Sequence, residues 1–209
     1  MNENIQKFKE YLEIRFPNLK DIKHTFQECS KDDNHNNSLV DSQMRTINFD
    51  KLTKWYRQPA PQSADSLSFS DKFLYLIEFK AGDPTSHSRK LDKLISGAIG
   101  KINDSDETLT DMYSEAFGDD TRLEQRFCLV IDSKQMGTMP IISTLANLSL
   151  SGNHFVTGKE RIMFEKVKPE IEQGVVNGAH YSGIEIWYSE LFDKYLGLRK
   201  IVNSVEICA

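Results

Sequence analysis

Two acidic residues and a lysine are placed where one expected hairpin would bring them together. Asp65 opens a segment of alternating apolar and polar residues, and Glu78 and Lys80 stand two positions apart near the end of the apolar run that follows. Side chains on a strand alternate between its two faces, so Glu78 and Lys80 point to the same side. Antiparallel pairing through a turn would bring Asp65 close to both. The pattern therefore predicts a cluster of two carboxylates and one ammonium.

Such a cluster suits one kind of chemistry. Two neighbouring carboxylates repel each other unless a cation neutralises them, and their oxygens suit Mg²⁺ or Mn²⁺. A bound metal of this kind lowers the pKa of a water ligand, and a nearby lysine can orient or deprotonate that water. These properties are typical of metal-dependent phosphodiester hydrolysis. A Glu-x-Lys pair alone is also common as a solvated salt bridge at a sheet edge, and both interpretations stay open here.

The hairpin itself follows from the periodicity of the residues around it. Residues 64–71 alternate between apolar and polar, which predicts a half-buried strand, and residues 73–79 form a nearly continuous apolar run, which predicts a central strand. Ser70 to Lys72 supply the turn between them. Residues 89–102 then carry apolar side chains at helical spacing, so a helix is expected directly after the hairpin.

The rest of the chain supplies further elements around this hairpin. Periodicity predicts helices at 3–16, 47–58, 159–172 and 190–198, and strands at 126–132 and 183–189. Residues 30–42 have the composition of a loop, and residues 139–150 fit no single element. The acidic stretch 104–124 is interpreted as a solvated face, with a partner surface or a second metal locus as alternatives. This order predicts one α/β domain over residues 1–209 with a mixed sheet.

Composition limits the class of protein. The chain has 209 residues, a net charge of −5 and a pI of about 5.6, which argues against indiscriminate nucleic-acid binding without excluding a nuclease. No apolar run approaches the roughly 18 residues of a membrane span, and the N-terminal residues lack a signal-peptide core, so a cytoplasmic protein is expected. Three widely spaced cysteines, Cys29, Cys128 and Cys208, argue against a disulfide framework and a zinc site.

The hairpin sequence also resembles a known superfamily. The segment SADSLSFSDKFLYLIEFKAG, followed by LDKLISGAIGKINDS, resembles PD-(D/E)XK nucleases over about residues 60–132. The resemblance implies a restriction-endonuclease-like, three-layer α/β core at about 45–135, with an N-terminal helical segment and a C-terminal α/β extension. It also implies that Asp65 and Glu78 bind Mg²⁺, for which Mn²⁺ can substitute, and that Lys80 assists the attacking water.

The same resemblance suggests further site residues. It implies that the backbone carbonyl of Phe79 binds the metal and that a basic residue on the following helix faces the site. Lys101 is the candidate catalytic residue there, assisted by Ser105, although a solvated lysine is an equal alternative. Some members carry an acidic residue on a helix before the hairpin, and spacing does not choose among the available ones. These are Glu10, Glu13 and Asp50.

A mixture of aromatic and basic residues precedes the hairpin. Lys54 and Arg57, beside Trp55 and Tyr56, have the composition of a nucleic-acid contact, because aromatic rings stack on bases and cations contact phosphates. The alternative, which the sequence favours, is that the two aromatic residues complete the hydrophobic core. Lys54 and Arg57 are therefore nucleic-acid-binding candidates of lower rank than the hairpin residues.

Two functional hypotheses from different classes follow. The first is a Mg²⁺-dependent nuclease that acts on DNA in a bacterial or phage restriction, repair or defence setting, with a protein partner or a homodimer compatible with it and no membrane association. The second is a protein of nuclease fold that acts as a binding subunit or an inhibitor without catalysis. A purely structural α/β module with a surface salt bridge is a third interpretation. The sequence does not separate DNA from RNA, or endonuclease from exonuclease action.

Overall fold

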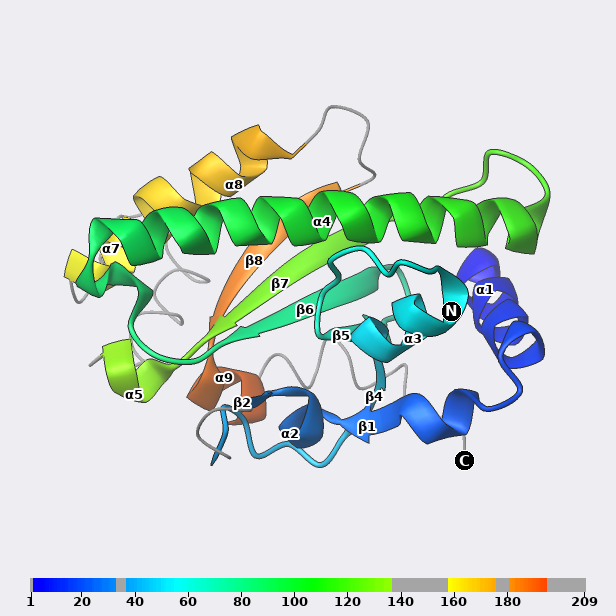
Figure 1. Cartoon of the computed structure of the whole chain (residues 1–209), viewed down its shortest axis with the longest axis horizontal. Coiled ribbons are helices and arrows are strands. Elements are labelled where there is room, and N and C mark those ends of the chain that lie inside the picture. The colour runs from blue at the N-terminus through cyan, green and yellow to red at the C-terminus, as the bar shows by residue number, and fades with distance from the viewer. Residues whose placement is uncertain (1, 33–36, 137–157, 176–180, 195–209) are drawn as a thin grey trace.

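One mixed β-sheet forms the centre of the molecule (Figure 1). The computed structural model describes residues 2–32, 37–136, 158–175 and 181–194. The sheet has six strands in the order β1-β4-β5-β6-β7-β8, and β2 and β3 form a separate two-stranded sheet. The strands are β1 (Lys23–Thr25), β2 (Lys31–Asp32), β3 (Asn37–Ser38), β4 (Arg45–Asn48), β5 (Ser66–Phe69), β6 (Leu74–Lys80), β7 (Gln125–Ile131) and β8 (Tyr181–Tyr188).

The strand directions divide the main sheet into two halves. Strands β1, β4, β5 and β6 pair antiparallel, whereas β6, β7 and β8 pair parallel. Strands β6 and β7 lie in the interior of the sheet and are buried along almost their whole length. This burial explains their nearly continuous apolar sequences, because an interior strand that is covered on both faces has no solvated side.

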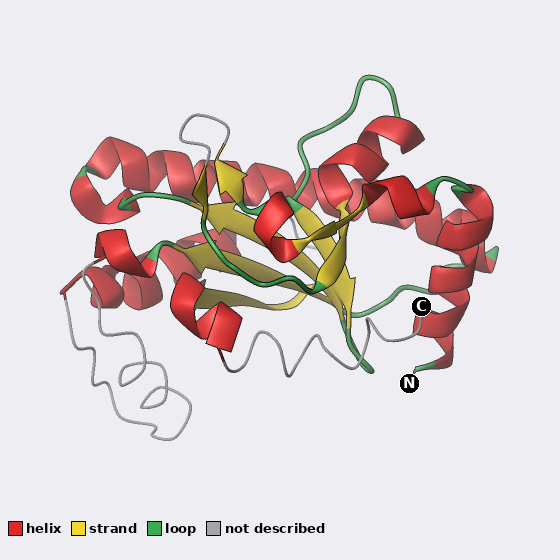
Figure 2. Cartoon of the chain, turned by 90° about the horizontal axis from the view of Figure 1, so that it is seen from below, coloured by secondary structure: helices red, strands yellow, loops and turns green. Residues whose placement is uncertain are grey.

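Helices cover both faces of the sheet. They are α1 (Glu3–Arg15), α2 (Phe26–Cys29), α3 (Phe49–Tyr56), α4 (Ser88–Phe117), α5 (Ser133–Met136), α7 (Gly158–Ile162), α8 (Lys168–Gly174) and α9 (Ser189–Lys194), with the 3₁₀ turns η1 (Leu19–Ile22) and η2 (Pro84–Ser86) and the π-helical turn η3 (Met163–Val167). Helices α1, α4 and α8 lie on one face, and α2 and α9 lie on the other (Figures 1 and 2). On the second face Phe26, Phe79 and Phe192 pack edge to face. The α/β class and the mixed sheet predicted from the sequence are therefore confirmed.

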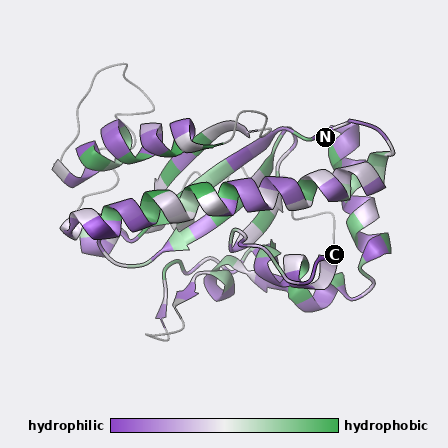
Figure 3. Ribbon diagram, turned by 45° about the horizontal axis from the view of Figure 1, so that its top comes forward, coloured by the Kyte–Doolittle hydropathy of each residue, from purple (hydrophilic) through white to green (hydrophobic). Residues whose placement is uncertain are grey.

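The long helix α4 corrects one prediction. Its 30 residues run to Phe117, whereas the sequence pattern predicted a helix that ended at residue 102. Within the acidic stretch, Leu109, Met112 and Tyr113 are fully buried and continue the inner stripe of the helix (Figure 3). Dense acidic residues on the outer side concealed this stripe. The helix ends where Gly118 adopts a left-handed conformation with φ of 73°.

The antiparallel half of the sheet also differs from the prediction. Strands β1 and β4 were not predicted, and the helix expected over residues 47–58 begins only at Phe49, because Asn48 ends β4 and caps α3 by accepting a hydrogen bond from the Lys51 backbone N–H at 2.9 Å. Strands β2 and β3 fall in the stretch expected to be a loop. Residues 139–150 lie outside the described residues.

Two expectations drawn from composition can be compared with the structure. Cys128 is buried in β7, as its apolar surroundings predicted, and Cys29 is a half-buried free thiol. No helix within the described ranges combines the length and the apolar character that a membrane span requires.

A single carboxylate joins three helices at the N-terminal side of the molecule. Glu115 on α4 accepts hydrogen bonds from the hydroxyls of Tyr11 and Tyr56 at 2.7 and 2.9 Å. The Arg15 guanidinium donates to the same carboxylate at 3.3 Å. These donors come from α1 and α3, so Glu115 fixes both helices against the far end of α4. They also hold the pKa of Glu115 below its usual value, with the Tyr11 hydrogen bond as the main cause.

We expect Glu115→Ala to lower the free energy of unfolding by about 1 to 2 kcal/mol, because it removes three hydrogen bonds to a charged acceptor at a partly exposed site. Urea denaturation would measure the change. Glu107→Ala is the matched control on the same helix, since Glu107 contacts Arg57 at 2.8 Å in an exposed ion pair and should cost less than about 0.5 kcal/mol. Equal losses in the two variants would contradict a bracing role for Glu115.

Candidate active site

The β5–β6 hairpin brings the two predicted carboxylates together. Ser66 pairs with Ile77, and the antiparallel register continued by one residue sets Asp65 opposite Glu78. Directly opposed residues of antiparallel strands have their Cβ atoms about 5 Å apart on the same face of the sheet. The hairpin turn lies where the sequence predicted it, with the Ser70 N–H donating to the Phe73 carbonyl at 2.8 Å. The register therefore places the predicted cluster on the face that α4 covers.

Glu78 is a buried carboxylate between two ammonium groups. Its side chain is 1% exposed, Lys80 Nζ lies 2.6 Å from Oε1, and Lys101 Nζ lies 2.6 Å from Oε2. A buried charge without a partner is strongly unfavourable, so these two lysines are what allow a glutamate at this interior position. The lysines differ in exposure: the Lys80 side chain is 37% exposed and that of Lys101 is 21% exposed. Lys80 thus reaches towards solvent, whereas Lys101 bridges from the helix.

Asp65 shares the Lys101 ammonium with Glu78. Lys101 Nζ lies 3.3 Å from Asp65 Oδ1, and the Phe79 backbone N–H donates to Oδ2 at 2.7 Å. Burial and then the Glu78 charge raise the pKa of Asp65 to about 7, against the opposing effects of Lys101, the Phe79 amide and Lys80. Burial lowers the pKa of Lys101, but the two carboxylates more than compensate and raise it. The pair therefore holds a firmly charged lysine beside an aspartate that titrates near neutral pH.

Helix α4 also fixes the chain that leads into Asp65. The Ser105 hydroxyl accepts a hydrogen bond from the Ala64 N–H at 3.3 Å, and the Asp104 carboxylate accepts one from the Gln62 N–H at 3.1 Å. The sequence named Ser105 but placed Asp104 in an acidic stretch that was interpreted as a solvated face. The i, i+3, i+4 spacing of Lys101, Asp104 and Ser105 puts them on one helix face, and this was the signal that could have identified Asp104.

Other predicted site residues lie apart from the cluster. Arg57 pairs with Glu107 at 2.8 Å on the outer surface of α4, and Lys54 is exposed on α3. Of the three acidic candidates before the hairpin, Asp50 contacts the hydroxyl of Ser63. The other two have partners elsewhere: Glu10 accepts from Gln6 and Glu13 pairs with Lys23. No described contact joins any of these side chains to Glu78.

The donor set fits one hard cation. Within the described residues no group of three or more His, Cys, Asp and Glu side chains is arranged to hold a metal. The cluster itself offers two carboxylates, those of Asp65 and Glu78. Glu78 Oε1 is buried and accepts no hydrogen bond from the described residues, although the Lys80 ammonium lies near it. Mg²⁺ is commonly held by one or two carboxylates, with waters and substrate phosphates completing the shell. Phe79 contacts Asp65 through its amide, and its carbonyl remains a predicted ligand.

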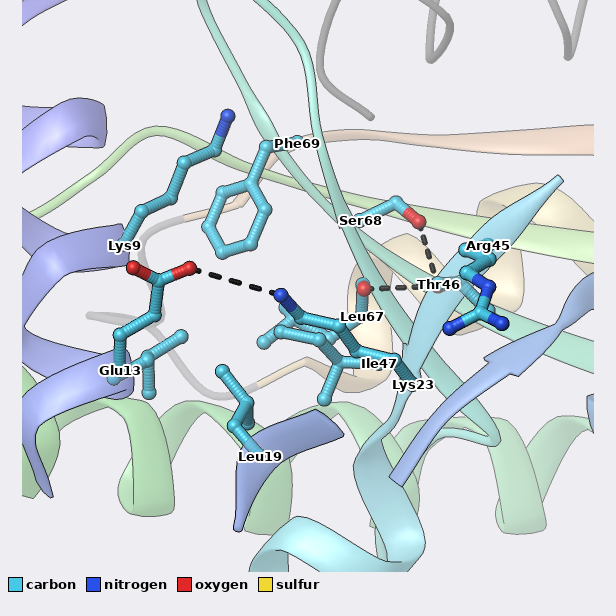
Figure 4. Close-up of a pocket in the computed structure, with 11 residues that line it drawn as sticks. Lys9, Glu13, Leu19, Lys23, Arg45, Thr46, Ile47, Leu67, Ser68 and Phe69 are labelled. Carbon is cyan, nitrogen blue, oxygen red and sulfur yellow. Dashed lines mark hydrogen bonds and ion pairs between the residues drawn. The ribbon is translucent and has the colours of Figure 1, made fainter. Parts of the chain in front are cut away.

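A separate pocket lies between α1 and the antiparallel edge of the sheet (Figure 4). It encloses about 80 Å³, and its apolar floor includes Leu67 and Phe69. Lys23 and Glu13 form an ion pair of 3.6 Å across its mouth. None of the lining residues belongs to the carboxylate–lysine cluster, so the chemistry predicted from the sequence is not located in this pocket.

Comparison with known proteins does not add to this description. Family models, curated proteins and solved structures each give no match to the chain. The resemblance to PD-(D/E)XK nucleases therefore stays a prediction from the hairpin sequence.

Proposed function

We propose that this protein is a divalent-metal-dependent nuclease that hydrolyses phosphodiester bonds in DNA and acts in the cytoplasm of a bacterium, or during phage infection, in restriction, repair or defence. The observation that carries the proposal is a fully buried glutamate opposite an aspartate on a hairpin, with two lysines between and beside them. The mixed sheet flanked by helices accords with a restriction-endonuclease-like fold. Mg²⁺ is the proposed cofactor, and Mn²⁺ should replace it.

The charges of the cluster support this choice of substrate. With both carboxylates ionised, their charges and those of the two ammonium groups sum to zero, so the metal-free cluster then has no net attraction for an anion. With a divalent cation bound, the same groups carry a surplus of two positive charges. A phosphodiester, which carries one negative charge per linkage, complements that surplus.

The four side chains divide the work of hydrolysis. Asp65 and Glu78 would hold the cation, which when bound supplies Lewis acidity toward the phosphate and lowers the pKa of a water. Lys80, the more exposed lysine, orients the attacking water and adds positive charge beside the phosphate. Lys101 holds the two carboxylates together from the helix side. Asp104 and Ser105 position the segment before Asp65 through its backbone.

One observation favours the second candidate, a binding protein of nuclease fold that lacks catalysis. Each carboxylate already has an ammonium within 3.3 Å, so the cluster is complete as a structural ion-pair network. A protein of this type would gain no stability from divalent cations. The nuclease must gain stability from them, because a ligand that binds only the folded state raises its melting temperature.

The first test is cleavage. We expect Asp65→Asn to reduce Mg²⁺-dependent cleavage of duplex and single-stranded DNA by about 10²-fold or more, because one of two metal-binding carboxylates is lost. The asparagine side-chain oxygen still accepts the Phe79 N–H, so the melting temperature in EDTA should not fall. Asp71→Asn, the same change in the exposed hairpin turn, is the control and should retain full activity. Undiminished cleavage by Asp65→Asn would contradict the assignment of this site.

The second test uses pH. The raised pKa of Asp65 means that the folded chain binds its proton more tightly than the unfolded chain, whose pKa is about 3.9. The contribution of this group to the stability of the metal-free protein therefore falls as pH rises from about 4 to about 7. A metal must displace the same proton, so its apparent affinity should weaken by about tenfold per pH unit below 7. The increase in melting temperature caused by Mn²⁺ should be larger at pH 8 than at pH 6. An equal increase at both pH values, or none at either, would contradict this.

The third test examines the counter-charge role of Lys101. We expect Lys101→Met to lower the stability of the metal-free protein by about 3 kcal/mol, because it leaves Glu78 with one ammonium in a buried site. Saturating Mn²⁺ should restore much of that loss. Lys93→Met, on the exposed side of the same helix, is the control. If Lys101→Met and Lys93→Met unfold at the same midpoint without metal, the counter-charge role is ruled out.

A further inference from the structure

Two basic side chains meet beside the hairpin, on elements that the sequence did not connect. Lys51 Nζ, from the first turn of α3, lies 3.1 Å from His24 Nε2, from the edge strand β1. The Lys51 side chain is exposed and His24 is half-buried. A lysine that contacts an imidazole instead of a carboxylate keeps its full charge available to an external anion.

The backbone places this pair next to the carboxylate cluster. The Phe49 N–H, at the start of α3, donates to the Asp65 carbonyl at 3.2 Å, so Lys51 stands two residues from a direct backbone contact with Asp65. His24 pairs with Thr46 across β1 and β4, and β4 pairs with β5. Strand spacings of about 4.8 Å and rises of about 3.3 Å per residue put the backbones of His24 and Asp65 about 14 Å apart. The register sets His24 on the sheet face opposite Asp65, so a nucleic-acid strand that contacts both sites would pass round the end of the sheet where α3 begins.

The charged neighbours leave the pair open to an anion. No carboxylate among the described residues lies within ion-pairing distance of Lys51. Glu28 approaches from α2, but its carboxylate accepts the Thr25 N–H at 2.7 Å and completes the cap of that helix. Arg45 on β4 stands beside the same glutamate and adds positive charge. Lys51 thus differs from Arg57, whose guanidinium is already paired with a carboxylate.

We infer that His24 and Lys51 form a phosphate-binding subsite, which holds the DNA backbone a few nucleotides from the bond that is cut. The inference rests on the proposed nuclease function and extends it, because it names the residues that bind the substrate outside the catalytic cluster. Lys51 supplies the charge, and His24 fixes the lysine side chain by their contact. We therefore expect His24 and Lys51, and not Lys54 and Arg57, to make the main DNA contact next to the catalytic cluster.

The experiment measures DNA binding apart from cleavage. A fluorescently labelled DNA duplex is titrated with the full chain in EDTA over a range of salt concentrations, and cleavage with Mg²⁺ is assayed separately. Lys51→Met should weaken binding by about 5- to 10-fold at low salt and reduce the slope of log affinity against log salt by about 1, the value for one lost phosphate contact. His24→Asn should weaken binding by about 2- to 3-fold, because the lysine loses its support.

Lys72→Met is the matched control, since it removes the same charge from the exposed hairpin turn, at the end of β5 and β6 away from Asp65. It should leave the salt slope unchanged. A Lys51→Met protein with the affinity and slope of Lys72→Met, or a wild-type chain that does not bind DNA, overturns the subsite. If the Lys51 effect on binding appears but no divalent cation supports cleavage, the nuclease proposal fails and the subsite stands. If the wild-type chain cleaves DNA normally and Lys51→Met binds DNA as Lys72→Met does, the subsite fails and the nuclease proposal stands.

Discussion

The buried charge of Glu78 is the constraint on which the rest of the site depends. Its carboxylate lies in the interior of a sheet strand, where an unpaired charge would be strongly unfavourable. The two ammonium groups that compensate it come from its own strand and from the helix that crosses the sheet. Because the Lys101 ammonium lies 2.6 Å from Glu78, this contact fixes the position of β6 relative to α4. Replacing either lysine alone would leave the buried Glu78 carboxylate with a single ammonium partner.

Helix α4 turns this local pairing into a defined site. One of its faces supplies Lys101 to the carboxylates and Asp104 and Ser105 to the backbone that enters Asp65. Its distant end is held to α1 and α3 by Glu115. Because the 30-residue helix α4 is held at the cluster and at Glu115, it cannot shift without moving the helices and strands that it contacts. The distance between Asp65 and Glu78 is thus set by the whole α4-covered face of the sheet as well as by the hairpin.

The same four side chains suit two electrostatic states. Without a cation, the charges of two ionised carboxylates and two lysines balance. The pKa of Asp65 is raised to about 7, so this carboxylate is partly protonated near neutral pH. A divalent cation would relieve the repulsion between the carboxylates and leave positive charge where a phosphate can approach. A buried structural ion-pair network can also raise the pKa of an aspartate, so the response to a divalent cation is what separates the two interpretations. Strongly shifted pKa values are common at functional sites, and this one accords with the proposed catalysis.

The sequence by itself determined the hairpin, the shared face of Glu78 and Lys80, and the helix that follows them, because strand alternation and helical spacing are local properties. Lys101 became a candidate through the resemblance to PD-(D/E)XK nucleases, and not through the helical spacing. Only the tertiary structure decided that Lys101 lies between both carboxylates, that α4 continues through the acidic stretch to Phe117, and that β1 and β4 extend the sheet. Short edge strands carry too few residues to show a period, and buried residues within an acidic helix are hidden by their neighbours. The sequence likewise could not predict the contact between His24 and Lys51, because only strand pairing brings residues 27 positions apart into contact.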